Sequence, residues 1–173
     1  MRVALRVPAI LDIEASGFGR GSYPIEVGVA MPDRSVVSFL IAPDDDWTHW
    51  SEEAENLHGL SRELLVEKGF SPRQVAEQLN LLLEGQVVYS DGWGVDSGWL
   101  ALLFYYAGLR QAFQLETLTR ILTEDQLRCW DDTRDALFAA NDGRRHRAGF
   151  DAHILQDTYI ETWEQAQAAA RDT

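Results

Sequence analysis

The chain has 173 residues, of which 46% are hydrophobic and 25% are charged, a globular balance that argues against a disordered or fibrous protein. Its formal net charge of −13 disfavours nonspecific attraction to long nucleic acids, because phosphate binding normally relies on Lys and Arg surfaces. No apolar run approaches the roughly 20 residues that cross a bilayer, so we expect no membrane partner. The length predicts one domain over residues 1–173, and the single Cys129 fits a reducing cytoplasm.

Three strand-like segments open the chain. Residues 3–13 are rich in Val, Ile and Leu, which predicts a buried strand. Gly and Pro punctuate residues 17–24, which predicts a loop. Residues 25–30 and 36–41 are the next two predicted strands, and the composition of residues 32–34 between them is typical of a hairpin turn.

The rest of the chain mixes helical and strand patterns. Ser51 and Ser61 can each cap a short helix, Ser71 can open a longer one, and Thr123 begins a capping-box pattern. Further on, we expect strands at 86–89 and 113–118, and helices at 97–106, 123–140 and 150–170. Three strands followed by strands that alternate with helices predict an α/β domain with a mixed sheet.

Asp12 and Glu14 are two acids in an otherwise apolar strand. Because they are two residues apart, their side chains point to the same face of the sheet. Two carboxylates that close repel each other unless a positive charge joins them, and a hard divalent cation suits their oxygens. The alternative is a strand end that reaches solvent, with both acids simply hydrated.

Two later segments also carry candidate residues. Asp96 follows a Gly-rich turn between a strand and a helix, where an acid can hold a metal or merely favour the positive end of the helix. His146 lies in a loop five residues before Asp151, which is placed in the first turn of the last helix. Viewed alone, a loop His and a first-turn Asp are also compatible with an inert surface.

Together, these segments resemble the DEDDh (DnaQ-like) exonuclease family. The resemblance lies in LDIEASG at 11–17, VDSGWL at 95–100 and HRAGFDA at 146–152, in that order along the chain. It continues between these motifs, in IEVG at 25–28 and LHGL at 57–60. The likeness therefore spans nearly the whole chain.

This resemblance implies a ribonuclease H-like fold, with a central mixed five-stranded sheet flanked by helices, and stepwise 3′-to-5′ removal of nucleotides. It implies that Asp12, Glu14, Asp96 and Asp151 hold two Mg²⁺ or Mn²⁺ ions, with His146 as general base. The chemistry is consistent, because two metal ions can stabilise the attacking and leaving oxygens of a phosphodiester displacement. A neutral imidazole can take the proton of the attacking water.

The chain departs from the family pattern in two places. Family members commonly have Thr after the first-motif Glu, where this chain has Ala15 and Ser16, so a hydroxyl contact is shifted or lost. The second motif commonly begins His-Asn, and Asp91 and Gly92 take those positions here. Asp91 is therefore a rival metal ligand, although Asp96 is followed by an aromatic residue and a leucine at the family's spacing.

Several residues near these motifs are candidates for contacting the substrate. Gly17 could offer a backbone N–H group and Phe18 an aromatic edge, although Phe18 could equally be core. Trp47, Trp50 and Trp93 fall in or beside predicted loops, where they could stack on bases or pack in the core. The predicted substrate-binding residues on these segments are Ala15, Ser16, Gly17, Phe18 and Trp93.

Two further substrate contacts are predicted. His58 resembles a family position that approaches the scissile nucleotide, and helix capping or solvent exposure is its alternative role. Arg144, Arg145 and Arg147 surround His146 and concentrate positive charge where phosphates would lie, and Arg147 is the predicted contact. The remaining acidity favours a short or single-stranded 3′ end over a long duplex.

We therefore expect a 3′-to-5′ exonuclease that acts on single-stranded or short DNA or RNA. The alternatives are a catalytically weak or inactive binding module with the same fold, and an accessory module of a polymerase or RNA-processing complex. The sequence does not choose between DNA, RNA and short oligonucleotides, nor between a monomer and a homodimer.

Overall fold

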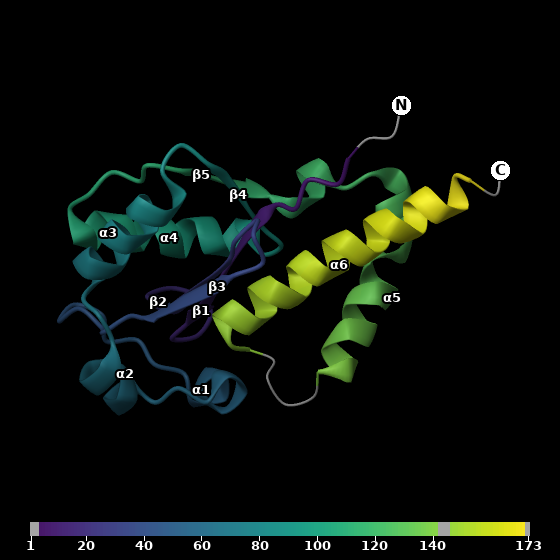
Figure 1. The fold of residues 1–173 in the computed structure, drawn as a ribbon. Helices are drawn as coiled ribbons and strands as arrows, with labels where there is room; N and C mark the ends of the chain where they lie inside the picture. The colour runs from purple at the N-terminus through teal and green to yellow at the C-terminus, as the bar shows by residue number, and fades with distance from the viewer. Residues whose placement is uncertain (1–3, 142–145, 172–173) are drawn as a thin grey trace.

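A five-stranded mixed sheet forms the centre of the computed structural model, which describes residues 4–141 and 146–171 (Figure 1). Its strands are β1 (Ala9–Ala15), β2 (Pro24–Ala30), β3 (Val36–Leu40), β4 (Val87–Ser90) and β5 (Gln114–Thr117). Their spatial order is β3-β2-β1-β4-β5, with antiparallel pairing from β3 to β1 and parallel pairing from β1 to β5. The predicted α/β fold class and mixed five-stranded sheet are confirmed.

The first strand begins later than predicted. β1 starts at Ala9, and residues 4–8 before it have no regular structure, while residue 3 lies outside the described residues. The pairing partners explain the difference, because β2 contacts β1 no further back than Ile10 and β4 no further back than Ala9. An apolar segment does not form a β-strand where no neighbouring strand supplies hydrogen-bond partners for its backbone.

Helices flank the sheet on both faces. In the described part of the chain they are α1 (Glu52–His58), α2 (Arg62–Lys68), α3 (Pro72–Leu83), α4 (Trp93–Ala107), α5 (Glu124–Ala140) and α6 (Ala148–Ala169), with a 3₁₀ turn at Leu118–Ile121. The predicted caps at Ser51, Ser61, Ser71 and Thr123 are confirmed, since each side chain accepts a backbone N–H bond from the first turn of its helix. None of these described helices is long and apolar enough to cross a lipid bilayer.

Two helices begin earlier than predicted. The structure starts α4 at Trp93 instead of residue 97, and α6 at Ala148 instead of residue 150. Gly92 and Arg147 occupy the N-cap positions, and neither helix has a side-chain cap bond. The sequence therefore lacked the Ser, Thr, Asp or Asn signal that marks a helix start.

The sheet separates two apolar cores. On one face, Ile10 and Ala30 pack with residues of α5 and α6, among them Trp130, Ala152 and Leu155. The other face carries the alternate residues of β1 and β2, which pack in a larger core with side chains of α2, α3 and α4. Asp12 and Glu14 share the parity of Ile10, so they lie on the α6 face of β1.

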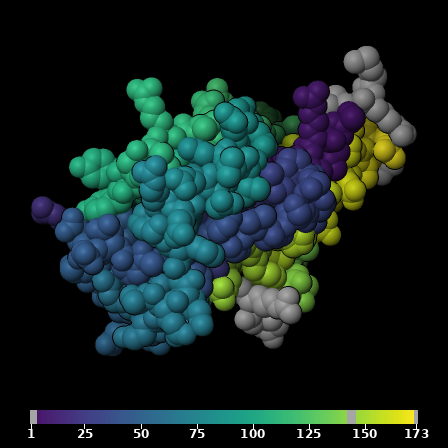
Figure 2. Space-filling model, turned by 60° about the vertical axis from the view of Figure 1, so that its left-hand side comes forward, coloured from purple at the N-terminus to yellow at the C-terminus, as the bar shows by residue number. Residues whose placement is uncertain are grey.

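The N-terminal end of α6 lies directly against the sheet. A Cβ added at Gly28 would lie 2.1 Å from the backbone N of Gly149, and one added at Gly149 would lie 2.1 Å from the Ser38 Oγ. No side chain larger than hydrogen fits at either position without movement. Figure 2 shows β3 at the surface between the helices on one side and α6 on the other, as expected for an edge strand. The close approach of Gly28 and Gly149 brings the first turn of α6 close to the acids of β1.

Candidate active site

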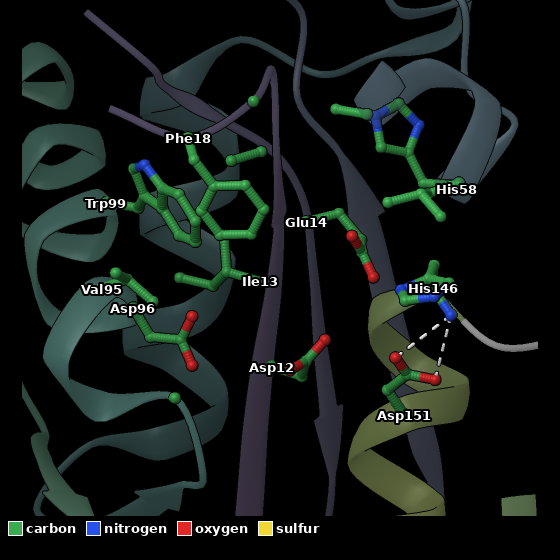
Figure 3. A pocket seen from close by; sticks show the side chains of 15 residues that line it. Asp12, Ile13, Glu14, Phe18, His58, Val95, Asp96, Trp99, His146 and Asp151 are labelled. Atoms are coloured by element: carbon green, nitrogen blue, oxygen red, sulfur yellow. Dashed lines mark hydrogen bonds between the residues drawn. The ribbon is translucent and has the colours of Figure 1, made fainter. Parts of the chain in front are cut away.

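A cavity of about 330 Å³ opens at the C-terminal end of β1, between α1, α4 and the start of α6. Figure 3 shows Asp12 and Glu14 on β1 between two walls, with Asp96 and Trp99 on one side and His146 on the other. All five residues of the predicted catalytic centre line this cavity. The complete lining is Asp12, Ile13, Glu14, Ala15, Gly17, Phe18, Ala54, Leu57, His58, Gly92, Val95, Asp96, Trp99, His146 and Asp151.

Asp12 and Glu14 are held close to other acids. Burial raises the pKa of Asp12 well above its ordinary range, and the negative charges of Asp96 and Glu14 raise it further. Burial also raises the pKa of Glu14 to about 8, with Asp151 and Glu26 adding to the shift. The strand thus presents two carboxylates that are costly to ionise without a cation.

Asp96 is fixed at the first turn of α4. Its side chain is buried, and the Ser90 hydroxyl at the end of β4 donates a hydrogen bond to its Oδ2. Burial raises the pKa of Asp96 to about 7, against the lowering effect of this bond. A Cβ at Gly92 would come within 3.1 Å of the Asp96 carboxylate, so a glycine gives that carboxylate room.

Asp91, the rival to Asp96, lies outside the cavity lining. It is part exposed and faces Arg134 of α5, whose Nη1 is 3.9 Å from the Asp91 Oδ2. Burial raises the pKa of Asp91, and Arg134 lowers it. The geometry favours Asp96 as the residue that completes the acidic cluster.

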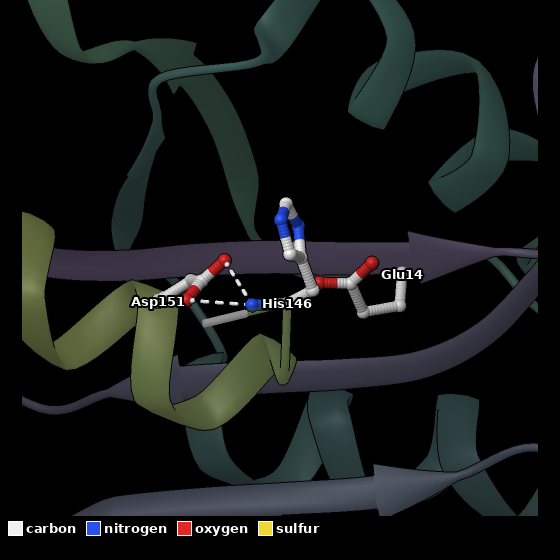
Figure 4. Close-up of side chains that lie close together, drawn as sticks. All are labelled: Glu14, His146 and Asp151. Carbon is white, nitrogen blue, oxygen red and sulfur yellow. Dashed lines mark hydrogen bonds between the residues drawn. The ribbon is translucent and has the colours of Figure 1, made fainter. Parts of the chain in front are cut away.

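His146 and Asp151 are joined at the start of α6 (Figure 4). The His146 backbone N–H donates to both carboxylate oxygens of Asp151, with N···O distances of 3.2 and 3.1 Å. His146 has a φ of 68°, which non-glycine residues seldom adopt. Ligand atoms of Glu14, His146 and Asp151 all lie within 4.8 Å of one another. The local backbone thus turns this His and Asp toward the acids of β1.

These residues fit a divalent metal. Carboxylate oxygens are the donors that Mg²⁺ and Mn²⁺ prefer, and the charges of Asp96 and Asp151 raise the pKa values of both Asp12 and Glu14. Glu14, His146 and Asp151 form the compact group, while Asp12 and Asp96 stand further along the same cavity. The donor set, taken together, can hold one or more hard cations.

Comparison with known proteins gives matches in structure but not in sequence: no protein-family model and no curated protein sequence matches the chain. Exonuclease I of E. coli in complex with a dA16 oligonucleotide superposes with a TM-score of 0.65 at 14% identity. That match covers 89% of this chain and 40% of the other. The chain has the ribonuclease H-like fold.

Two further matches have the same character. The zinc-bound complex of E. coli exonuclease I with single-stranded DNA has a TM-score of 0.66 at 15% identity, covering 91% of this chain and 40% of that one. Exonuclease I from Methylocaldum szegediense has a TM-score of 0.63 at 15% identity, covering 88% and 40%. The chain spans about 40% of the length of these ribonuclease H-like structures.

Four of the seven predicted substrate-binding residues line the cavity on this ribonuclease H-like fold, namely Ala15, Gly17, Phe18 and His58. Phe18 is 76% exposed, and its ring centroid lies 6.0 Å from that of Trp99. Gly17 packs closely, since a Cβ there would lie 2.7 Å from the Ser51 Cβ. This loop therefore places an aromatic ring at the mouth of the cavity.

The other three predicted contacts lie outside the lining. Ser16 is fully buried, and its Oγ accepts the Tyr23 backbone N–H and pairs with the His49 Nδ1 at 3.0 Å. Trp93 is the first residue of α4 and donates from its Nε1 to the Leu115 carbonyl at 3.1 Å. Arg147 donates from its Nη2 to the Glu26 Oε1 at 2.8 Å. Contact of these three residues with a substrate stays a prediction.

The remaining candidates of the sequence also fall away from the cavity. Trp47 is buried and stacks on Tyr23, and Trp50 donates from its Nε1 to the Glu55 carboxylate. Their alternative role in packing is the one observed. The predicted positive charges of Arg144 and Arg145 lie outside the described residues.

His58 lines the cavity and has one ring nitrogen without a hydrogen-bond partner in the described part of the chain. Its Nδ1 accepts the Leu60 backbone N–H at 3.1 Å, so the proton of a neutral ring is on Nε2. That nitrogen has no hydrogen-bond partner among the described residues, although the side chain is only 6% exposed. Burial lowers the pKa of His58, which favours the neutral ring. The His58 Nε2–H is thus a buried donor without a hydrogen-bond partner among residues 4–141 and 146–171, in a side chain that lines the cavity.

The apolar walls of the cavity and the buried acid Glu26 were not among the site residues predicted from the sequence. Val95 and Trp99 lie one turn apart on α4, and Ala54 and Leu57 lie one turn apart on α1, so each pair follows a helical period. A predicted start of α4 at residue 93 would have placed Val95 and Trp99 on one face of the helix and so identified this wall of the cavity. Glu26, an acid in a fully buried strand, was visible as an exception to the apolar pattern.

Proposed function

We propose that the chain is a metal-dependent 3′-to-5′ exonuclease that hydrolyses phosphodiester bonds at single-stranded or short nucleic-acid 3′ ends. The observation that carries this proposal is the meeting of four carboxylates and one histidine in a single cavity of a ribonuclease H-like fold. Residues 1–173 would act as one domain, and we place it in the cytoplasm, in keeping with the free Cys129.

The proposed ligands of two Mg²⁺ or Mn²⁺ ions are Asp12, Glu14, Asp96 and Asp151. When bound, such ions neutralise charge on the scissile phosphate and stabilise the attacking and leaving oxygens. The raised pKa values of Asp12 and Glu14 support this role, because carboxylates that repel each other gain most from a shared cation.

His146 is the proposed general base. It stands at the wall of the cavity formed by the start of α6, within ligand distance of Glu14 and Asp151. A neutral imidazole there can take the proton of the attacking water as the phosphodiester bond breaks. The hydrogen bonds from its backbone N–H to Asp151 hold the residue in place.

Phe18 and His58 are the proposed contacts of the terminal nucleotide. The exposed Phe18 ring, supported by Trp99, offers a face for a base to stack on, and such stacking tolerates any sequence. His58 lines the cavity and its Nε2 has no hydrogen-bond partner among the described residues, which supports a hydrogen bond to a phosphate or sugar oxygen. The net charge of −13 disfavours a long duplex, and oligonucleotide complexes of the similar exonuclease I structures support a single strand.

One assay tests this function. Purified protein is mixed with 5′-labelled single-stranded DNA or RNA in Mg²⁺, Mn²⁺ or EDTA, beside the variants Asp12→Ala and Asp45→Asn. We expect ladder-like shortening that EDTA and Asp12→Ala abolish, while Asp45→Asn, which changes an exposed acid outside the cavity, retains it. No turnover of any oligonucleotide, with metal bound, would instead favour a binding or accessory module of a polymerase or RNA-processing complex.

A further inference from the structure

The carboxylate of Glu26 holds the segment that carries His146 and Asp151. Glu26 lies on β2 and is only 2% exposed. Its Oε2 accepts hydrogen bonds from the Arg147 Nε at 3.1 Å and the Ala148 backbone N at 3.0 Å, and its Oε1 accepts from the Arg147 Nη2 at 2.8 Å. Both oxygens of one side chain thus bind the N-cap and the first residue of α6.

This contact stands beside the proposed metal ligands. Glu26 is the direct cross-strand partner of Glu14, so the two side chains project from the same face of the sheet. Arg147, bound to Glu26, is near enough to Glu14 to oppose the effect of burial on the pKa of that carboxyl. Glu26 therefore joins β2, the strand that pairs with β1 at Glu14, to α6, the helix that carries Asp151.

The segment held by Glu26 has a conformation that needs support. His146 directly precedes Arg147 and has a left-handed φ of 68°. Such a backbone persists in a non-glycine residue only where its surroundings determine it. The Asp151 carboxylate holds the His146 N–H on one side, and the Glu26 carboxylate holds the next two residues on the other.

We propose that Glu26 is a positioning residue: with Arg147, it sets the places of His146 and Asp151 relative to Glu14 without touching the substrate. Under this proposal Arg147 acts through Glu26 and not through a phosphate. Its activity readout rests on the proposed function, but its structural and metal-binding readouts do not.

A second anchor of α6 supplies a matched control. Arg34, in the turn between β2 and β3, pairs with Asp157 of α6 and donates to the Gln156 Oε1 at 2.9 Å. Like the Glu26 contact, this one ties α6 to the β2–β3 hairpin. Asp157 lies outside the cavity lining, so Asp157→Asn should weaken the ion pair between Arg34 and α6 without altering the segment at His146.

The test compares Glu26→Gln, Arg147→Lys and Asp157→Asn with the parent. Glutamine keeps the size of Glu26 but lacks its charge and replaces one carboxylate oxygen with an NH₂ donor, so it cannot accept all the hydrogen bonds that Arg147 and Ala148 donate to Glu26. Lysine keeps the charge of Arg147 without its paired hydrogen bonds, and it replaces the first variant if Glu26→Gln does not fold. Three readouts are taken: amide hydrogen exchange of the metal-free protein, Mn²⁺ affinity by electron paramagnetic resonance, and kcat and KM on a single-stranded oligonucleotide.

For Glu26→Gln or Arg147→Lys, we expect exchange at the His146 and Ala148 amides to rise about tenfold or more. Mn²⁺ affinity and kcat should fall roughly 10- to 100-fold, with KM changed less than about threefold. Asp157→Asn should stay within about threefold of the parent in every readout. Unchanged exchange and Mn²⁺ affinity in the first two variants, or equal losses in Asp157→Asn, would overturn the proposal. A parent without nuclease activity would refute the proposed function alone, since exchange and Mn²⁺ binding would still decide the role of Glu26.

Discussion

Glu14 and Glu26 face each other across β1 and β2, yet their carboxylates have opposite surroundings. Arg147 pairs with Glu26, whereas Glu14 faces Asp151 in the cavity, and burial raises the pKa of Glu14 to about 8. One carboxylate is thus neutralised by the protein itself, and the other gains most from an external cation.

The metal-free protein should lose stability as the pH rises from about 4.5 to about 8. Because the folded-state pKa of Glu14 lies above its ordinary value of 4.5, the folded state binds more protons than the unfolded chain across this window. Glu14→Gln removes the part of this loss that Glu14 causes and should be more stable than the parent by about 1–3 kcal/mol at pH 8 in EDTA. Urea denaturation at pH 5 and pH 8 measures the difference, which should nearly vanish at pH 5. Equal stability of variant and parent at pH 8 would contradict the prediction.

His146→Ala should remove most of the nuclease activity while the metals still bind. Loss of a general base typically costs about 10²- to 10⁴-fold in rate, and the proposed metal ligands are the four carboxylates. Single-turnover rates and Mn²⁺ titration separate the two effects. His153→Ala is the control, because His153 lies on α6 just after the segment of His146, with its Nε2 3.5 Å from the Asp157 Oδ2, and outside the cavity. A parallel fall in Mn²⁺ affinity would instead make His146 a ligand.

Phe18→Ala should weaken substrate binding more than it slows the reaction. Stacking of a base on an aromatic ring contributes about 1–3 kcal/mol, so KM for a single-stranded oligonucleotide should rise about 5- to 150-fold. Tyr105→Ala is the control, since Tyr105 is 79% exposed on α4 but does not line the cavity. If both variants had the same KM, Phe18 would have no part in binding.

Gly28→Ala should destabilise the protein by about 1–3 kcal/mol or more, because the added methyl group would meet the backbone of Gly149 at 2.1 Å. Gly98→Ala is a matched control that should instead raise the stability of the protein. Gly98 is exposed on α4 with nothing within 4 Å of a Cβ, so alanine there should stabilise the helix by about 0.5–1 kcal/mol. Thermal unfolding of both variants measures the contrast, and a Gly28→Ala protein as stable as its parent would refute the close contact.

Local chemistry explains which elements could be predicted from the sequence. Capping side chains at Ser71 and Thr123 mark the starts of α3 and α5, and both capping boxes are present. The starts of α4 and α6 were placed too late, since Gly92 and Arg147 give no capping signal. The end of a strand also depends on its neighbours, so the start of β1 was placed too early.

The residues of the candidate site also fall into two groups, those that short sequence motifs identify and those that only the fold brings together. Motif residues such as Asp12, Asp96 and His146 were named from short sequence patterns, and the fold brings them into one cavity. Glu26 was not named as a site residue, because its partner Arg147 is 121 positions further along the chain. No local pattern reports such a contact, and only the packing of α6 on β2 creates it.

The alternation along β1 makes the pairing of that strand a test of correct folding. Leu11 and Ile13 fill the core against α3 and α4, while Asp12 and Glu14 between them line the cavity. A shift of one residue in the register of β1 against β2 would turn both carboxylates into the apolar core and both aliphatic side chains toward the cavity. Because two unpaired charges would then be buried, a chain with this shifted register would be much less stable than the native fold. Every molecule that folds with the native pairing of β1 therefore has both Asp12 and Glu14 on the side of the cavity.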